Sequence, residues 1–395
     1  MYEGILSGLR VLDFSWVLAG PYATRILADF GAEVIKVQSR KTAKGAESNR
    51  TGYFNTWNRN KLGITLDMSR PEAAEIVLKL AGISDVVVEN FSPRVMANWG
   101  LDYAKLREVK SDLIMVSLSA MGQGGPWKDF VAYGPTLQAL SGLTYLTSFT
   151  QDAPMGLGYA HADPIIGLYA TLAVLAALEY RDRTGEGQYI DISDFEAVCT
   201  LLGPALMDTK INQREVLPHG NAAPDVPASP HGCYRCLGTD QWCAIAVFSE
   251  DEWHALRAVM GAPAWMEEER FFSLLKRREH EKELDKRLEE WTVQRRAEEV
   301  VQLLQGAGVP AGLVQDAEAL ANDAHLIANQ FFVPAEDSVF GRIYWDRSPI
   351  RLTETSQAPW NAAPLLGEDN RYVFSELLGF TEDELSAYTE MGIIG

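Results

Sequence analysis

The chain has 395 residues, and its 54 acidic against 35 basic residues give a formal net charge of -19. Nucleic acids and anionic membranes attract clustered Lys and Arg, so this charge argues against both as partners. The N-terminal stretch MYEGILSGLRVLDFSW lacks the basic and long apolar regions of a signal peptide, and no apolar run is expected to reach transmembrane length. Four cysteines in so long a chain do not form a disulfide framework, and we expect a cytoplasmic protein.

Short apolar runs alternate with amphipathic runs of helical period along the first half of the chain. Strands that read as continuous apolar segments are typical of a parallel sheet covered on both faces. The sequence therefore predicts an α/β fold with a Rossmann-like, doubly wound parallel sheet. The expected strands are residues 8–14, 33–37, 85–91, 112–118 and 188–193, and the expected helices between them are 21–32, 72–83 and 102–109.

The segment HADPIIGLYATLAVLAALEYRDRTGEG predicts a long buried helix that starts near Asp163. An acidic residue at a helix start is usually a cap, and Pro164 suits the first helical position. Structural capping is therefore the first interpretation of Asp163. A carboxylate at a helix N-terminus is also held ionised and close to N–H donors, so the same position suits a nucleophile.

The composition changes after residue 204, where Pro, Gly and small residues predict a linker. We expect residues 1–204 to form the first part of a large α/β domain, 205–230 the linker, 231–332 a smaller α+β domain and 333–395 a return to the large domain. Residues 376–394 predict a terminal pair of helices that packs on the large domain. Cys233 and Cys236 form a C-x-x-C pattern on an expected β-hairpin, but no second pair completes a zinc site, so no metal is expected.

The turn after the first strand, DFSWVLAGPYA, lacks the glycines of a dinucleotide-binding loop. The chain also has neither a Walker A sequence nor the G-x-S-x-G of serine hydrolases. We therefore expect a ligand held in another way at the carboxyl edge of the sheet.

Several long segments in order resemble the family III coenzyme A transferases, the group of formyl-CoA transferase and carnitine CoA-transferase. The segments are GLRVLDFSWVLAGPYATRILADFGAEVIKVQ, VVVENFSP, YGPTLQALSG, the stretch from Gly158 to Ser193, and PLLGEDN. The resemblance implies an Asp nucleophile at the start of the long helix, where Asp163 stands. It also implies acyl-CoA as a substrate with no tightly bound cofactor, and an interlocked homodimer or a hetero-oligomer with a related subunit.

The resemblance assigns further residues to the site. Tyr133 matches a tyrosine near the transferase nucleophile, with burial in the core as its alternative. Arg59 and Lys61 are candidates for the CoA phosphates, although a solvated loop explains them as well. In the family, a basic residue just after the second strand contacts the adenine. Here Gln38 and Ser39 occupy those positions and Arg40 comes one position later, so the adenine contact is in doubt. The residues that match loops holding CoA, or else pack at strand ends, are Val17, Leu18, Ala19, Asn90 and Phe91.

The function implied is transfer of CoA from an acyl-CoA such as succinyl-CoA to a carboxylic acid, with an aromatic dicarboxylate such as benzylsuccinate as an acceptor. The fold is shared with α-methylacyl-CoA racemases, which use a histidine where Tyr133 stands. Tyrosine is a poor base at neutral pH, so the racemase alternative is weaker. A non-catalytic acyl-CoA-binding subunit is a third possibility, and Asp163 argues against it.

Overall fold

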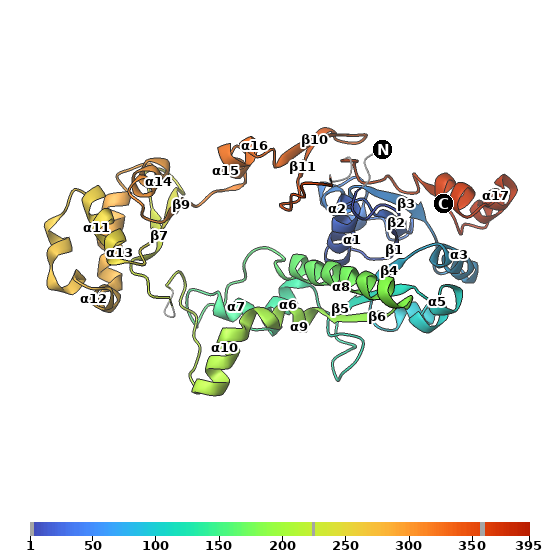
Figure 1. The fold of residues 1–395 in the computed structure, drawn as a ribbon, viewed down its shortest axis with the longest axis horizontal. Coiled ribbons are helices and arrows are strands. Elements are labelled where there is room, and N and C mark those ends of the chain that lie inside the picture. Colours follow the sequence, from blue (N-terminus) through green and yellow to red (C-terminus); the bar gives the residue numbers. More distant parts are fainter. Residues whose placement is uncertain (1–3, 223–225, 356–359) are drawn as a thin grey trace. The chain divides into compact units, whose positions relative to one another are not determined.

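The computed structural model describes residues 4–222, 226–355 and 360–395 (Figure 1). These residues form two compact units, each described below by itself. Unit 1 comprises Met1–Thr144, Gly156–Glu215 and Ile327–Gly395, and unit 2 comprises Tyr145–Met155 and Val216–Leu326. The expected linker 205–230 includes 223–225, which lie outside the described residues.

Unit 1 is built on a six-stranded parallel sheet with the order β3-β2-β1-β4-β5-β6. The chain works outward from β1 in both directions, which makes the sheet doubly wound, as predicted. The in-register pairs Leu12–Ile35 and Leu12–Val87 place β1 between β2 and β4. The strands are β1 (Arg10–Asp13), β2 (Glu33–Gln38), β3 (Lys61–Thr65), β4 (Val86–Glu89), β5 (Ile114–Ser119) and β6 (Tyr189–Ser193).

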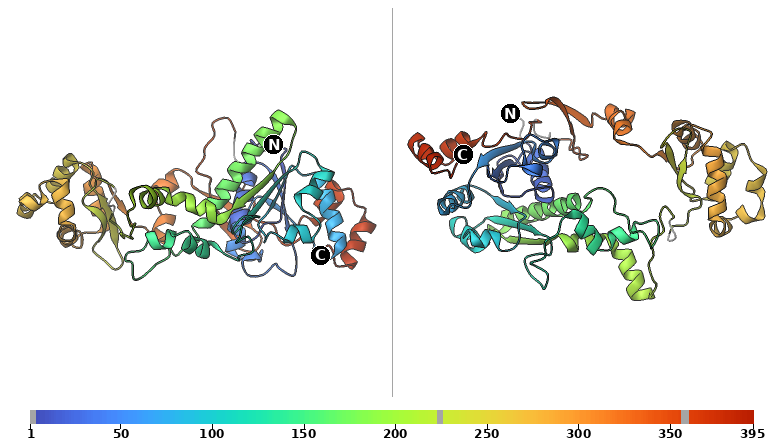
Figure 2. Two further views of the ribbon diagram at one scale, coloured as in Figure 1. Left: turned by 90° about the horizontal axis from the view of Figure 1, so that it is seen from below. Right: turned by 180° about the vertical axis from the view of Figure 1, so that it is seen from behind.

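Helices cover both faces of this sheet (Figure 2). Helices α3 (Pro71–Gly82) and α5 (Tyr103–Val109) share a buried core with Leu12, Ile35 and Met115 of the strands. Helices α1 (Ala19–Asp29) and α8 (Ala162–Thr184) pack closely on one another. A Cβ at Gly167 would lie 2.8 Å from the carbonyl oxygen of Ala19, so this close packing requires the glycine.

The last part of the chain completes unit 1. The hairpin of β10 (Phe332–Asp337) and β11 (Gly341–Asp346) precedes the helical turns at Tyr372–Leu377 and α17 (Glu382–Glu390). Phe374 and Phe380 pack into the same core as α3. The other helices of unit 1 are α2 (Gly52–Asn58), α4 (Val95–Asn98), α6 (Gly134–Leu140), α9 (Asp194–Cys199) and α10 (Gly203–Met207), with α7 (Leu143–Leu146) and α16 (Ala324–Ala328) at the unit boundaries.

Strand β3 is an element that the sequence analysis missed, because residues 61–65 read as a loop. Gly63 lies in the middle of this strand, where a glycine normally weakens a strand pattern. A Cβ at position 63 would lie 2.8 Å from the ring of Pro364, so the glycine lets the C-terminal segment approach the edge of the sheet. The backbone N–H of Gly63 donates to Asp369 at 2.6 Å.

Helix α8 is longer and more apolar than the sequence analysis allowed. Its 23 residues include a window with a mean hydropathy of 1.5, which is enough to cross a membrane by length and composition alone. The expectation that no run reaches such a length was therefore wrong. The helix packs on α1 within the α/β unit, and the core helix of a globular protein passes the same test.

Unit 2 contains a three-stranded sheet packed on helices. Strands β7 (His231–Arg235) and β8 (Trp242–Ala246) pair antiparallel as the predicted hairpin, and β9 (Ala311–Leu313) joins β8. Its core includes Trp253, Phe271 and Leu288. The helices are α11 (Glu250–Val259), α12 (Leu274–Glu279), α13 (Glu281–Thr292), α14 (Ala297–Gly306) and α15 (Ala317–Ala321).

Candidate active site

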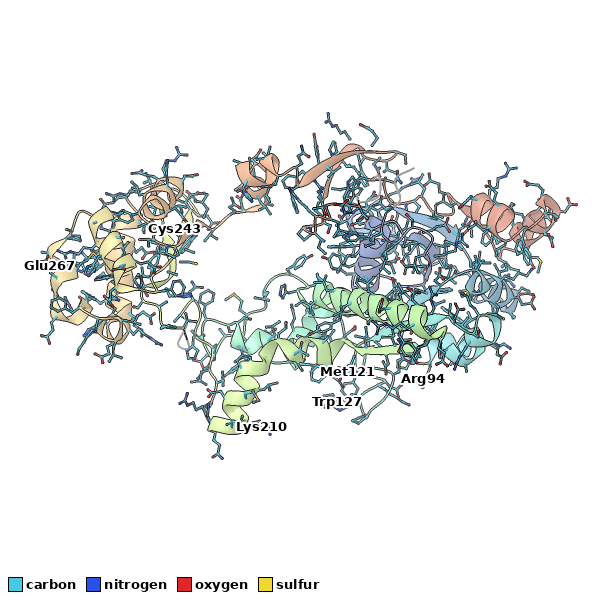
Figure 3. The ribbon with its side chains drawn as sticks, viewed as in Figure 1. Arg94, Met121, Trp127, Lys210, Cys243 and Glu267 are labelled. Carbon is cyan, nitrogen blue, oxygen red and sulfur yellow. The ribbon has the colours of Figure 1, made fainter. Side chains whose placement is uncertain are left out.

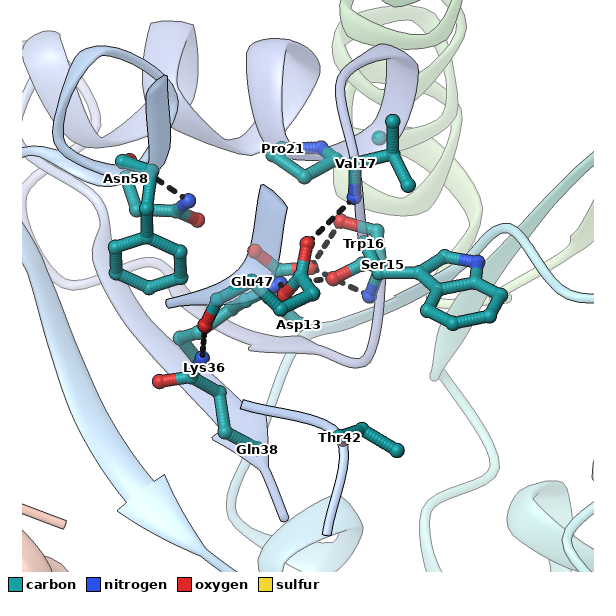
Figure 4. Close-up of polar contacts among 12 residues, drawn as sticks. Asp13, Ser15, Trp16, Val17, Pro21, Lys36, Gln38, Thr42, Glu47 and Asn58 are labelled. Atoms are coloured by element: carbon teal, nitrogen blue, oxygen red, sulfur yellow. Dashed lines mark hydrogen bonds and ion pairs between the residues drawn. The ribbon is translucent and has the colours of Figure 1, made fainter. Parts of the chain in front are cut away.

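A buried network of charges lies at the carboxyl end of β1 (Figure 4). Asp13 accepts hydrogen bonds from Lys61 Nζ at 3.0 Å and Thr24 Oγ1 at 2.7 Å, and its other oxygen accepts from Ser15. Burial alone would raise the pKa of Asp13, but Lys61, Lys36 and the hydroxyl donors bring it down to about 2. The network fixes the start of the loop that follows β1.

This loop is held in a strained conformation. Val17 has a φ of 64°, which is rare for a β-branched residue, and its N–H donates to Glu47 at 2.7 Å. Trp16 and Asn90 exchange two hydrogen bonds, at 2.8 and 2.9 Å, between the loops after β1 and β4. The two loops therefore form one rigid wall at the carboxyl edge of the sheet.

A cavity of about 460 Å³ lies on one side of this wall. Trp16, Phe91 and Trp99 contribute rings to its lining, and Phe91 contacts both tryptophans, with centroid distances of 6.0 and 5.3 Å. Lys41 also lines the cavity, and its exposed ammonium group pairs with Asp67 at 2.7 Å. The cavity thus combines three aromatic rings, packed at an angle to one another, with the cation of Lys41.

A second cavity, of about 120 Å³, shares Trp16, Phe91 and Ser92 with the first. Asp163 lies in its wall, so the structure brings the predicted nucleophile together with most of the other predicted residues. Its lining includes Val17, Leu18, Ala19, Asn90, Phe91, Lys128, Phe130, Tyr133, Gly134, Asp163 and Asp194.

The Asp163 carboxylate is not the cap of α8. The N-cap is His161, Asp163 is the second helical residue, and Pro164 is the third rather than the first. Asp163 Oδ2 is shielded from solvent and has no hydrogen-bond partner among the described residues. The structure therefore removes the capping explanation for this acid.

Burial raises the pKa of Asp163 to about 6, with only a backbone hydrogen bond acting against it. Desolvation therefore opposes the effect expected of the helix N-terminus, because it favours the protonated acid. The group is still mostly ionised at neutral pH. Gly134 leaves room for it, since a Cβ at position 134 would overlap Asp163 Oδ2.

Tyr133 precedes α6 and is 60% exposed, so it is not the buried core residue of the alternative interpretation. Its ring lines the Asp163 cavity. The loop before it carries Met121 and Trp127 (Figure 3), and Trp127 stacks on Phe130 at 5.5 Å. Of these aromatic residues, Phe130 and Tyr133 line the cavity, and Trp127 packs behind Phe130.

Arg59 and Lys61 do not reach either cavity. Arg59 is fully buried between Asp29 and Asp346, at 2.7 and 2.8 Å, and Lys61 is bonded to Asp13. Both cations are already neutralised within the protein, so assigning them to CoA phosphates was wrong. Arg40 is exposed next to the cavity residues Ser39 and Lys41.

Three acidic or phenolic groups near Asp163 were not found from the sequence. Asp194 starts α9 and lines the same cavity. Burial raises the pKa of Tyr53 to about 12, and the Asp163 charge adds to that shift. Tyr159 has its pKa raised by burial and by Asp163 as well. Apart from helix-start patterns, the sequence held no indication of these neighbours.

The comparisons with known proteins agree with this arrangement. CoA-transferase family III matches residues 6–370. The chain belongs to the family III CoA-transferases. This transferase is 33% identical over 393 residues to succinyl-CoA–D-citramalate CoA-transferase of Chloroflexus aurantiacus. The matched residues make up 96% of each of the two chains.

A second transferase and a solved structure also match nearly the whole chain. The transferase is 32% identical over 402 residues to the succinyl-CoA–L-malate CoA-transferase alpha subunit of Chloroflexus aurantiacus, over 98% of this chain and 92% of the relative. A CAIB/BAIF family protein from Brucella suis has a TM-score of 0.87 and 29% identity, over 95% of this chain and 100% of that one. The protein is therefore an enzyme that transfers CoA from a thioester to a carboxylic acid.

The cysteines of unit 2 lie on the β-hairpin. Cys233 is exposed, whereas Cys236 and Cys243 are buried, and burial raises the pKa of the Cys236 thiol. Among residues 4–222, 226–355 and 360–395, no group of three His, Cys, Asp or Glu side chains is arranged to hold a metal ion.

Proposed function

We propose that this transferase moves CoA from succinyl-CoA to a dicarboxylic acid, with Asp163 as the nucleophile. The observation that carries the proposal is the Asp163 carboxylate, which has an unpaired, shielded oxygen in a cavity at the carboxyl edge of the sheet. An acid that neither caps a helix nor pairs with a cation costs folding energy, so a role toward a ligand explains its position.

The reaction needs one ionised carboxylate and no net proton transfer. An Asp163 oxygen attacks the thioester carbon, the C–S bond breaks, and the CoA thiolate leaves an acyl anhydride on Asp163. The thiolate then attacks the Asp163 carbonyl carbon and releases succinate, which leaves an aspartyl-CoA thioester. The acceptor carboxylate attacks that thioester, and the expelled thiolate takes the new acyl group and restores the Asp163 carboxylate.

The two adjoining cavities suit the two ends of CoA. The larger one offers Phe91 and Trp99 for the adenine ring, and Lys41 with Arg40 for phosphate groups at its rim. The wall at Val17, Leu18 and Ala19 leads on to the Asp163 cavity, where the thioester would lie. In this proposal the exposed cations Lys41 and Arg40 bind the CoA phosphates, in place of the buried Arg59 and Lys61.

The relatives named above use succinyl-CoA with citramalate or malate, which supports a dicarboxylic acceptor. The rings of Phe130 and Tyr133 in the cavity lining favour an acceptor that carries a ring, such as benzylsuccinate. Lys128 lies in the same cavity wall and offers a cation for the second carboxylate of the acceptor. We further propose that CoA enters as a substrate and that no cofactor stays bound.

Helix α8 presents an apolar stripe that includes Leu168, Leu172 and Leu175, which are between 42% and 63% exposed. Such a stripe on an otherwise charged protein favours association with a second subunit. An interlocked homodimer, or a pair of related subunits like the alpha and beta subunits of the malate enzyme, accounts for it. We place the assembled enzyme in the cytoplasm.

Trapping the intermediate tests the proposal. Succinyl-CoA should leave an adduct on the peptide that contains Asp163, which hydroxylamine converts to a hydroxamate and mass spectrometry locates. Asp163→Asn should melt within a few degrees of the wild type and lose transfer activity. Asp152→Asn, an exposed acid outside the cavity linings, is the matched control and should be fully active.

Two results would contradict the proposal. A folded Asp163→Asn enzyme that still transfers CoA would exclude this acid as the nucleophile. Rapid exchange of the α-proton of a 2-methylacyl-CoA in heavy water, without CoA transfer, would instead favour the racemase alternative.

A further inference from the structure

A second acid in the Asp163 cavity, Asp194, neither caps its helix nor pairs its shielded oxygen. Asp194 begins α9, but the cap of that helix is Ser193, whose hydroxyl accepts the N–H of Glu196 at 3.3 Å. Asp194 Oδ1 is shielded from solvent and has no hydrogen-bond partner in the described parts of the chain. Replacing such a group by an apolar one should not weaken the fold.

The charges that face Asp194 are mostly of its own sign. Asp163 approaches it from α8 and Glu89 from the end of β4, while Glu196 lies on its own helix. Lys128 and Tyr133 line the same cavity, and Lys128 is exposed. No ion pair to Asp194 is formed within the described residues.

Burial first, and then the charges of Asp163 and Glu89, raise the pKa of Asp194 to about 8. Burial also raises the pKa of Glu89 to about 7, although it accepts hydrogen bonds from Ser117 and from the backbone of Phe91. At neutral pH Asp163 is therefore the ionised member of the pair, and Asp194 carries its proton. Two carboxyl groups in one site with separated pKa values can take different roles in catalysis.

We propose that Asp194 is a neutral acid that donates a hydrogen bond to the oxygen of the acyl group reacting at Asp163. The inference rests on the proposed function, because it needs Asp163 to carry the acyl group. The thioester oxygen becomes negative when Asp163 attacks, and an O–H donor fixed in the cavity stabilises that charge. The proton stays on Asp194 throughout, so the balance of the reaction is unchanged.

A neutral Asp194 also serves the second half of the reaction. The acceptor reaches Asp163 as a carboxylate, and a second ionised acid in the cavity would repel it. The protonated form carries no charge. It can also donate a hydrogen bond to the carbonyl oxygen of the aspartyl-CoA thioester, which becomes negative when the acceptor attacks. The enzyme should therefore lose activity as Asp194 ionises.

The pH dependence of three enzymes tests the proposal. Wild-type kcat/KM should fall about tenfold per pH unit above pH 8, where Asp194 loses its proton. Asp194→Asn keeps a neutral donor, so it should retain activity within roughly tenfold at pH 7 and lose the alkaline fall. Asp194→Leu should lower kcat roughly 10²–10³-fold with an unchanged or higher Tm, as expected for a lost oxyanion donor.

Glu196→Gln is the matched control, because Glu196 is an exposed acid on the same helix, and it should keep the wild-type profile. An active Asp194→Leu enzyme, or an Asp194→Asn enzyme with the full alkaline fall, would overturn the inference. Hydroxylamine trapping separates this failure from that of the proposed function. A wild-type Asp163 adduct together with an active Asp194→Leu enzyme rejects the Asp194 role alone, and absence of the adduct rejects both.

Discussion

Replacing Lys61 by Met tests whether the buried charges below the active-site loop are structural. Lys61 Nζ donates to Asp13 at 3.0 Å, Thr24 at 2.7 Å and Asn58 at 2.9 Å, and the side chain is fully buried. The methionine fills the space but leaves Asp13 ionised without its nearest cation. Breaking a buried pair in this way costs about 3–5 kcal/mol, or a fall in Tm of roughly 6–15 °C.

Thermal unfolding followed by circular dichroism measures the loss, and Lys105→Met is the matched control. Lys105 pairs with Glu108 on an exposed helix face, so its loss should cost no more than about 1 kcal/mol. Asp13→Asn combined with Lys61→Met should recover part of the stability, because the unpaired charge is gone. A Lys61→Met enzyme with the wild-type Tm and a KM for CoA raised tenfold or more would refute this reasoning and restore Lys61 as a phosphate ligand.

Three further predictions concern the site and the hairpin. The pKa of Asp163 is raised to about 6 and the ionised form attacks, so kcat/KM should fall as the pH drops below 6; a flat profile down to pH 4.5 would contradict this. Gly134→Ala forces a Cβ onto Asp163 Oδ2 and should lower kcat at least about 10²-fold, whereas Gly124→Ala, with open space around it, should be active. Metal analysis of the purified enzyme should find far less than one zinc per chain, since Cys233 and Cys236 lack further ligands among the described residues.

Two of the correctly predicted strands are buried along their whole length. VVVE of β4 and IMVSLS of β5 are buried throughout, and nothing in their sequences competes with a strand. KLGIT of β3 was missed because its glycine is explained only by Pro364, which lies some three hundred positions later. A local pattern holds no information about such a partner.

The same limit applies to the site. Asp163 could be found because its helix and the family motif are local. The burial of Arg59 depends on Asp346, far along the chain, so its side chain read as a free cation. Asp194 reads as an ordinary acidic helix start, and only the folded chain shows that Ser193 caps the helix and that Asp194 faces Asp163.

The C-terminal segment that packs beside β3 determines when the sheet can be finished during synthesis. The N–H groups of Gly63 and Thr65 donate to Asp369 and Asn370, and Gly395 itself bonds to Thr65 at 3.0 Å. All six strands lie before residue 194, whereas their partners beside β3 come after residue 368. The β3 edge of the sheet therefore waits for its C-terminal partners until unit 2 has been translated, and an edge left open in this way is a site where a nascent chain can pair wrongly.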